Sequence, residues 1–154
     1  MKTLIVLTAV PGAGKSTWAD NYQKSHPHTY IVSADSIREE FFGSRKNFSN
    51  ESFVWATFRK RIHDYAHIND DVTVILDAIN AKNEYRQEFV EKTPEFDIHH
   101  LVYLKKSLAV ALAQNALRSK EMIVPPEIIA NYFAHIEEPN PLIHDLYTKV
   151  EIIN

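Results

Sequence analysis

The chain of 154 residues has no cysteine, only three glycines and no long uninterrupted apolar run. Without cysteine it can form neither a disulfide nor a thiolate metal site, which is expected of a cytoplasmic protein. No apolar run reaches the roughly 18 residues that a bilayer-spanning helix needs, so we expect no membrane partner. The net charge of −3 provides no general attraction for nucleic acid. Any site for a polyanion must therefore be local.

The length and the 45% hydrophobic content predict a single domain over residues 1–154. Runs rich in β-branched and aliphatic residues predict strands at 3–9, 29–34, 72–77, 98–104 and 146–153. Helices are expected near 15–25, 36–42, 51–68, 82–92, 107–118 and 126–136, and a turn at 137–141. The apolar stripe of the last helix is expected to lie in the core. This alternation predicts an α/β fold with helices on both faces of a sheet.

Two of the three glycines, Gly12 and Gly14, follow the first predicted strand and precede the expected start of a helix at Lys15. The segment matches the phosphate-binding pattern G-x-x-x-x-G-K-[ST] except at its first position, where Ala9 replaces glycine. Glycine allows the unusual backbone angles that point successive N–H groups at a phosphate. The order of strand, glycine turn and helix therefore predicts a P-loop, and a plain structural turn is the alternative.

A P-loop implies ATP and Mg²⁺ as ligands. The residues expected to surround the phosphates are Gly12, Ala13, Gly14, Lys15, Ser16 and Thr17. The helix that begins at Lys15 adds its free N–H groups and the positive end of its dipole. We expect the Lys15 ammonium to neutralise the β- and γ-phosphates and the Ser16 hydroxyl to bind Mg²⁺.

Carboxylates follow the second and third predicted strands. Asp35 comes directly after the second, with Arg38 one helical turn later, and Asp77 closes the third. Because the carboxyl ends of parallel strands meet at one edge of a sheet, both carboxylates are expected beside the P-loop. We predict that Asp77 binds Mg²⁺, with a turn-forming role as the alternative. For Asp35 the alternative is a helix cap for a helix that begins at Ser36.

Basic residues gather in two further segments. Arg118 lies in a short polar stretch before Pro125, and we expect residues 117–126 to form a lid that carries it over the transferred phosphoryl group. A solvated helix end is the alternative. Residues 36–63 hold six basic side chains against three acidic ones, an excess that suits either a groove for a phosphodiester backbone or a solvated surface.

Almost the whole chain resembles the polynucleotide 5′-hydroxyl kinase family, known from bacteriophages and bacteria. The residues that carry the resemblance are the P-loop Pro11–Ala19, Asp35 with Arg38, Asp77 with Asn80 and Arg86, and Arg118 ahead of Val124-Pro125. The resemblance implies a P-loop kinase three-layer sandwich, with a five-stranded parallel sheet in the order 2-3-1-4-5 and a short lid. It also implies that Asp35 is the general base and that Arg38 engages a phosphate of the acceptor.

The implied activity is ATP-dependent transfer of the γ-phosphoryl group to a hydroxyl, with the 5′-OH of a nucleic acid end as acceptor. Two alternatives remain open: a small-molecule or RNA-modifying kinase of the same fold, and a nucleotide-binding switch without catalysis. A switch needs no general base near the γ-phosphate, whereas a kinase does, so Asp35 distinguishes them.

Overall fold

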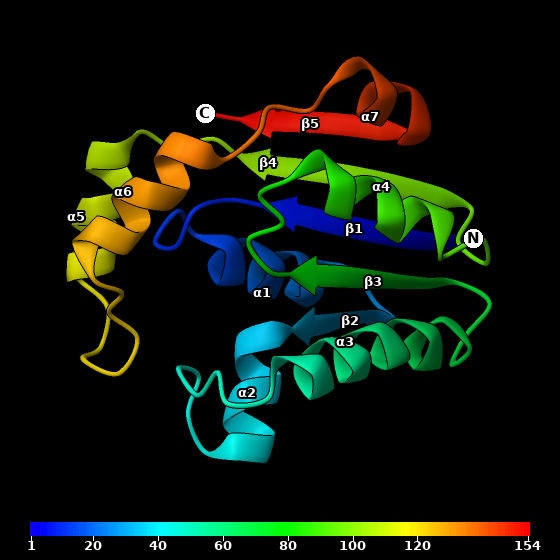
Figure 1. Cartoon of the computed structure of the whole chain (residues 1–154). Helices are drawn as coiled ribbons and strands as arrows, with labels where there is room; N and C mark the ends of the chain where they lie inside the picture. The colour runs from blue at the N-terminus through cyan, green and yellow to red at the C-terminus, as the bar shows by residue number, and fades with distance from the viewer.

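Five parallel strands form the central layer of the computed structural model, which describes all of residues 1–154 (Figure 1). They are β1 (Lys2–Thr8), β2 (Thr29–Ser33), β3 (Val72–Asp77), β4 (Ile98–Leu104) and β5 (Lys149–Ile153). Their order across the sheet is β2-β3-β1-β4-β5, which confirms the predicted topology. Because all strands run in one direction, their carboxyl ends form a single edge beside α5 and α6.

Seven helices surround the sheet: α1 (Lys15–Ser25), α2 (Ala34–Phe42), α3 (Glu51–Ala66), α4 (Asn83–Glu91), α5 (Leu108–Ala116), α6 (Pro126–His135) and α7 (Pro141–Leu146). Helices α2, α3, α4 and α7 pack on one face of the sheet. Helices α1, α5 and α6 pack on the other face. No helix is both long and apolar enough to cross a membrane.

The central strand β1 shows why its sequence is apolar without interruption. Leu4 and Val6 belong to the core beneath α3, whereas Ile5 and Leu7 belong to the core beneath α1. All four side chains are fully buried. Successive side chains of a strand point to opposite faces, so a strand covered on both faces needs apolar residues at every position.

Helix α7 differs from the prediction, because the sequence pattern indicates a turn that includes Asn140 and Pro141 and a strand that begins at Leu146. Asn140 instead caps the helix, its side chain accepting a hydrogen bond from the backbone N–H of Ile143 at 3.0 Å. Pro141 occupies the first helical turn, where its missing N–H costs nothing. The strand consequently begins at Lys149, three residues later than predicted.

Helix α2 begins two residues earlier than predicted, and this changes the position of Asp35. The cap is Ser33, whose hydroxyl accepts a hydrogen bond from the N–H of Ser36 at 3.2 Å. The alternative that Asp35 is the helix cap is therefore wrong. Asp35 lies in the first turn instead, and its side chain remains half exposed.

Candidate active site

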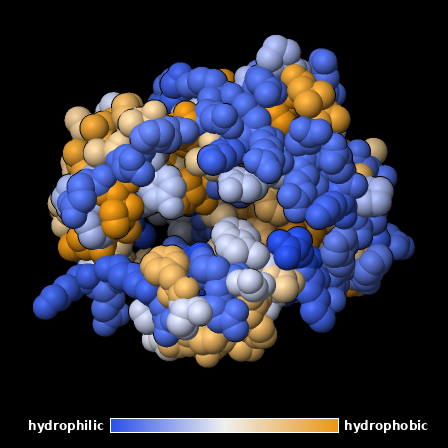
Figure 2. Space-filling model, viewed as in Figure 1, coloured by the Kyte–Doolittle hydropathy of each residue, from blue (hydrophilic) through white to orange (hydrophobic).

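A cavity of about 1500 Å³ opens at the carboxyl edge of the sheet, beside the hydrophobic surface of α5 and α6 (Figure 2). Its walls come from the P-loop, the starts of α2 and α3, the segment after β3, and the segment between α5 and α6. The predicted site residues Lys15, Ser16, Asp35, Asp77 and Arg118 all line it. The fold thus brings together side chains that lie up to about a hundred positions apart in the sequence.

The P-loop has the backbone that its glycines predict. Gly12 and Gly14 adopt positive φ angles of 86° and 97°. A Cβ on Gly12 would lie 2.5 Å from the backbone oxygen of Ala111 in α5, so the loop packs directly against this helix. Ala9 has no positive φ and donates its N–H to the Ile79 oxygen at 3.3 Å. Its backbone therefore does not require the glycine that the usual pattern has there.

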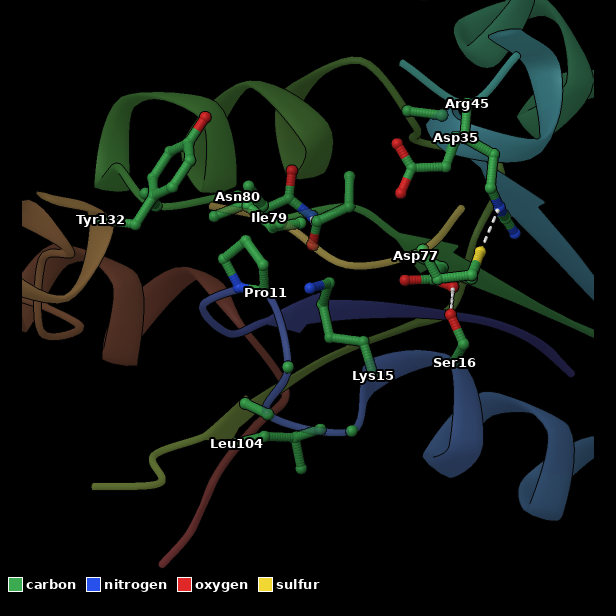
Figure 3. A pocket seen from close by; sticks show the side chains of 18 of the residues that line it. Pro11, Lys15, Ser16, Asp35, Arg45, Asp77, Ile79, Asn80, Leu104 and Tyr132 are labelled. Carbon is green, nitrogen blue, oxygen red and sulfur yellow. Dashed lines mark hydrogen bonds between the residues drawn. The ribbon is translucent and has the colours of Figure 1, made fainter. Parts of the chain in front are cut away.

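Lys15 extends from the start of α1 into the cavity (Figure 3). Its ammonium makes one hydrogen bond, to the Ala9 backbone oxygen at 3.4 Å. Burial lowers the pKa of Lys15, and the carboxylates of Asp77 and Asp35 partly offset this effect. The positive charge of Arg118 lowers the pKa further, which indicates that both cations act on the same part of the cavity. An anion bound there would relieve their repulsion.

Ser16 and Asp77 lie side by side at the base of the cavity. The Ser16 hydroxyl donates a hydrogen bond to the Asp77 carboxylate at 2.9 Å (Figure 3). Burial raises the pKa of Asp77, although Lys15 and the Ser16 hydrogen bond oppose the shift. A hydroxyl and a carboxylate are the hard oxygen ligands that Mg²⁺ prefers. This donor pair therefore fits the predicted magnesium ion.

Asp35 belongs to a chain of three charged groups that also includes Arg38 and Glu51. Arg38 donates one hydrogen bond to Asp35 at 2.8 Å and two to Glu51, at 2.6 and 3.0 Å. The Phe48 ring covers the guanidinium, 4.6 Å from its centroid. Burial works to lower the pKa of Arg38, but the Glu51 and Asp35 carboxylates outweigh it and raise the pKa. This arrangement holds the Asp35 carboxylate at the cavity wall.

Arg118 has a buried guanidinium nitrogen, Nη1, without any hydrogen-bond partner. Its backbone N–H donates to the Asn115 oxygen at 3.1 Å, which fixes the residue just beyond the end of α5. An unpaired buried donor costs roughly 1–3 kcal/mol, more for a charged group. Arg118 therefore offers a donor suited to an anionic ligand.

Residues 117–125, which join α5 to α6, are held by contacts at Val124 and at the neighbouring Met122 and Ile123. The Asn115 side chain pairs with the Val124 backbone through two hydrogen bonds, 2.7 and 3.0 Å long. Across the cavity, Arg45 donates to the Met122 sulfur at 3.2 Å (Figure 3). Lys46 donates to the Ile123 oxygen at 2.6 Å. The loop between α2 and α3 thus contacts this segment directly.

Asn80 and Arg86, two of the residues that carry the family resemblance, hold the backbone behind the cavity in place. Asn80 has a positive φ of 47° and donates to the Leu7 oxygen at 2.8 Å. Arg86 is fully buried and donates to the backbone oxygens of Asn80 and Glu137, at 3.0 and 2.8 Å. Asn80 lines the cavity but Arg86 does not. The observed contacts of Arg86 are those of a structural residue.

The apolar stripe of α6 is less buried than predicted. Ile129 is the one fully buried residue of α6, and Tyr132 and Ile136 pack against the core while partly buried. Ile128 and Phe133 are 44% and 42% exposed. Ile128 and Tyr132 line the cavity. The period of a helix therefore identified an apolar face here, but part of this face borders a ligand-sized space instead of the core.

A family model described as an AAA domain matches residues 4–139. The chain belongs to this family. An L-seryl-tRNA(Sec) kinase of Methanococcus maripaludis is 28% identical over 141 residues, covering 88% of this chain and 53% of that protein. The chain therefore spans about half the length of this curated relative.

Solved structures identify the fold of this AAA-domain protein as that of P-loop kinases. A chain of the Pnkp1/Rnl/Hen1 RNA repair complex has a TM-score of 0.76 at 20% identity, covering 88% of this chain and 44% of that chain. A gluconokinase of Sinorhizobium meliloti 1021 has a TM-score of 0.66 at 18% identity, covering 97% and 81%. These likenesses concern the fold alone.

Proposed function

We propose that this protein is an ATP-dependent kinase that phosphorylates a hydroxyl group, with the 5′-OH of a nucleic acid end as acceptor. The observation that carries the proposal is the convergence of two cations and one carboxylate in a single cavity. Lys15, the unpaired Nη1 of Arg118 and Asp35 all line this cavity, and the charges of Asp35 and Arg118 both act on Lys15. Phosphoryl transfer needs phosphate-binding cations and a base within one site.

In the proposed reaction the acceptor hydroxyl loses its proton to the Asp35 carboxylate as its oxygen bonds to the γ-phosphorus. The bond from that phosphorus to the bridging oxygen breaks, and ADP leaves with the electron pair. Arg38 holds Asp35 in place through their 2.8 Å hydrogen bond. Lys15 and Arg118 stabilise the charge on the transferred group, with Arg118 carried by a lid formed by residues 117–126.

Ser16 and Asp77 are the residues that would hold Mg²⁺ in this proposal. When bound, the ion would neutralise charge on the phosphates. Thr17 and the backbone of Gly12, Ala13 and Gly14 complete the phosphate site at the start of α1.

The acceptor part of the proposal rests on aromatic side chains beyond Asp35. Trp55, Tyr85 and Phe89 line this part of the cavity and provide planar surfaces on which a nucleic acid base can stack. The names of two similar proteins, a tRNA-directed kinase and an RNA repair complex, support a nucleic acid acceptor. The name of the gluconokinase supports the alternative of a small-molecule kinase.

The test is transfer of label from γ-labelled ATP to a panel of 5′-OH oligonucleotides, nucleosides and sugars, with Lys15→Ala as the inactive control. Labelling of oligonucleotides supports the proposal in full. Labelling of sugars or nucleosides alone contradicts the nucleic acid acceptor but retains the kinase. Nucleotide binding without any labelled acceptor contradicts the kinase and favours a switch.

A further inference from the structure

The surplus of basic residues between positions 36 and 63 is divided by the fold. Lys60 and Arg61 pair with Asp64 and Glu40 and do not line the cavity. The four others do line it: Arg38, Arg45, Lys46 and Arg59. Part of the basic surplus therefore lies in the cavity. The contacts of these four side chains show which of them is available to a ligand.

Three of the four are engaged within the protein. Arg38 is bound by Glu51 and Asp35, Arg45 by Met122 and Glu39, and Lys46 by the Ile123 oxygen. Arg59 makes no ion pair and no side-chain hydrogen bond, and it is exposed to the cavity's solvent. Arg59 is thus the basic residue of this segment whose charge no protein group satisfies.

The position of Arg59 along α3 relates it to the reacting end of the cavity. Glu51, Trp55 and Arg59 are spaced four residues apart, so they share one face of the helix, and all three line the cavity. Eight residues of helix rise about 12 Å. Moving away from Asp35, a ligand therefore meets a carboxylate, then an indole ring, and then an unpaired guanidinium.

The charge near Asp35 disfavours a phosphate of the acceptor itself at this end of the cavity. Asp35, Arg38 and Glu51 together carry a net charge of −1, because two carboxylates share one guanidinium. On α4, Tyr85 and Phe89 face the same space, and Glu88 there is paired with Lys92. An anionic group of the acceptor is therefore better placed further out, at Arg59.

We propose that Arg59 binds a phosphate of a single-stranded nucleic acid acceptor beyond the base that stacks on Trp55. The inference rests on the proposed function and names the residue that selects acceptors longer than one nucleotide. Arg38, by contrast, acts through Asp35 and contributes little to the affinity for the acceptor. A guanidinium suits this contact because it can donate two parallel hydrogen bonds to a phosphate.

The experiment compares Arg59→Ala with Arg61→Ala, a variant of the same helix whose side chain lies away from the cavity. Steady-state transfer from γ-labelled ATP is measured for a 5′-OH nucleoside 3′-phosphate and for 5′-OH oligonucleotides of two to five residues. We expect Arg59→Ala to raise the acceptor KM about tenfold for the oligonucleotides only, the effect of one lost phosphate contact. The kcat and the KM for ATP should stay within about twofold, and Arg61→Ala should match the wild type.

Binding of a fluorescently labelled 5′-OH oligonucleotide, with a non-hydrolysable ATP analogue present, separates this inference from the proposed function. Loss of one phosphate contact should reduce the slope of log K against log salt by about 1 in Arg59→Ala. An equal effect of Arg59→Ala and Arg61→Ala, or an equal loss for the nucleoside 3′-phosphate, overturns the role of Arg59. A wild-type enzyme that labels and binds no oligonucleotide overturns the nucleic acid acceptor itself.

Discussion

The two ends of the cavity are built in different ways. At the phosphate end, the backbone of the P-loop and the start of α1 form the site, with Gly12 packed against α5. At the acceptor end, the walls are side chains from α3 and α4 together with the loop that follows α2. A backbone site tolerates little change of conformation, whereas a side-chain wall can change its ligand by substitution. We therefore expect proteins of this fold to share the phosphate site and to differ in the acceptor that they bind.

The largest expected effect is at the phosphate end. Lys15→Ala should lower kcat about 10²–10⁴-fold, because in the proposed reaction its ammonium neutralises the β- and γ-phosphates and Arg118 cannot occupy the same position. Single-turnover transfer of labelled phosphate measures it, with Lys24→Ala at the exposed end of α1 as the control. Near wild-type transfer by Lys15→Ala would contradict the kinase proposal.

Asp35 lies where the two ends meet, and Asp35→Asn should lower kcat about 10³-fold. The substitution removes the proton acceptor but leaves the P-loop untouched, so the affinity for ATP should be nearly unchanged. Nucleotide binding by calorimetry and transfer kinetics together test this. Normal turnover by Asp35→Asn would assign the residue to the network of Arg38 alone.

Arg118→Ala should lower kcat about 10²–10³-fold, below the loss typical of an arginine supplied by a separate protein. Its Nη1 has no partner within the protein, and we expect the phosphates to supply one. The matched control is Lys120→Ala, in the same segment but outside the cavity lining. If ATP affinity fell as much as kcat, Arg118 would be a ground-state contact.

Glycine substitutions test whether the phosphate end depends on backbone geometry. Gly14→Ala should cost about 1–2 kcal/mol through its positive φ alone, since its Cβ would meet no atom within 4 Å. Gly12→Ala should cost about 1–3 kcal/mol more, because its Cβ would also collide with the Ala111 oxygen. Urea unfolding of both variants gives the difference in free energy of unfolding. Equal losses of stability would show that α5 shifts to make room for the Cβ at position 12.

The smallest effect is expected at the contact between the α2–α3 loop and the segment after α5. Lys46→Met removes the hydrogen bond to the Ile123 oxygen and should raise the KM for ATP about two- to threefold, as suits an exposed contact. Lys60→Met, which removes a surface ion pair on α3, is the control. An increase of tenfold or more would mean that the α2–α3 loop governs closure of the cavity.

Sequence patterns predicted the strands and the P-loop because both depend on short, contiguous signals, whereas the order of the strands followed from the family resemblance. A strand covered on both faces is apolar throughout, and glycines mark the positive φ angles beside Lys15. The partners of Arg38 had no such signal. Glu51 follows it by 13 positions, and only the turn between α2 and α3 brings the two together. The position of Ile128 in the cavity wall could not be predicted either, because helical periodicity does not distinguish a residue of the core from one that lines a cavity.

The two hydrogen bonds between Asn115 and Val124 determine where the segment between α5 and α6 can change in length. They close residues 116–123 into a ring whose base is fixed to α5. Arg118 lies near the fixed base, whereas Lys120 and Glu121 lie at the tip. Doubling the length of such a loop costs only about 0.6 kcal/mol in closure entropy. Insertions at the tip can therefore accumulate, and new acceptors can be accommodated, while Arg118 keeps its position.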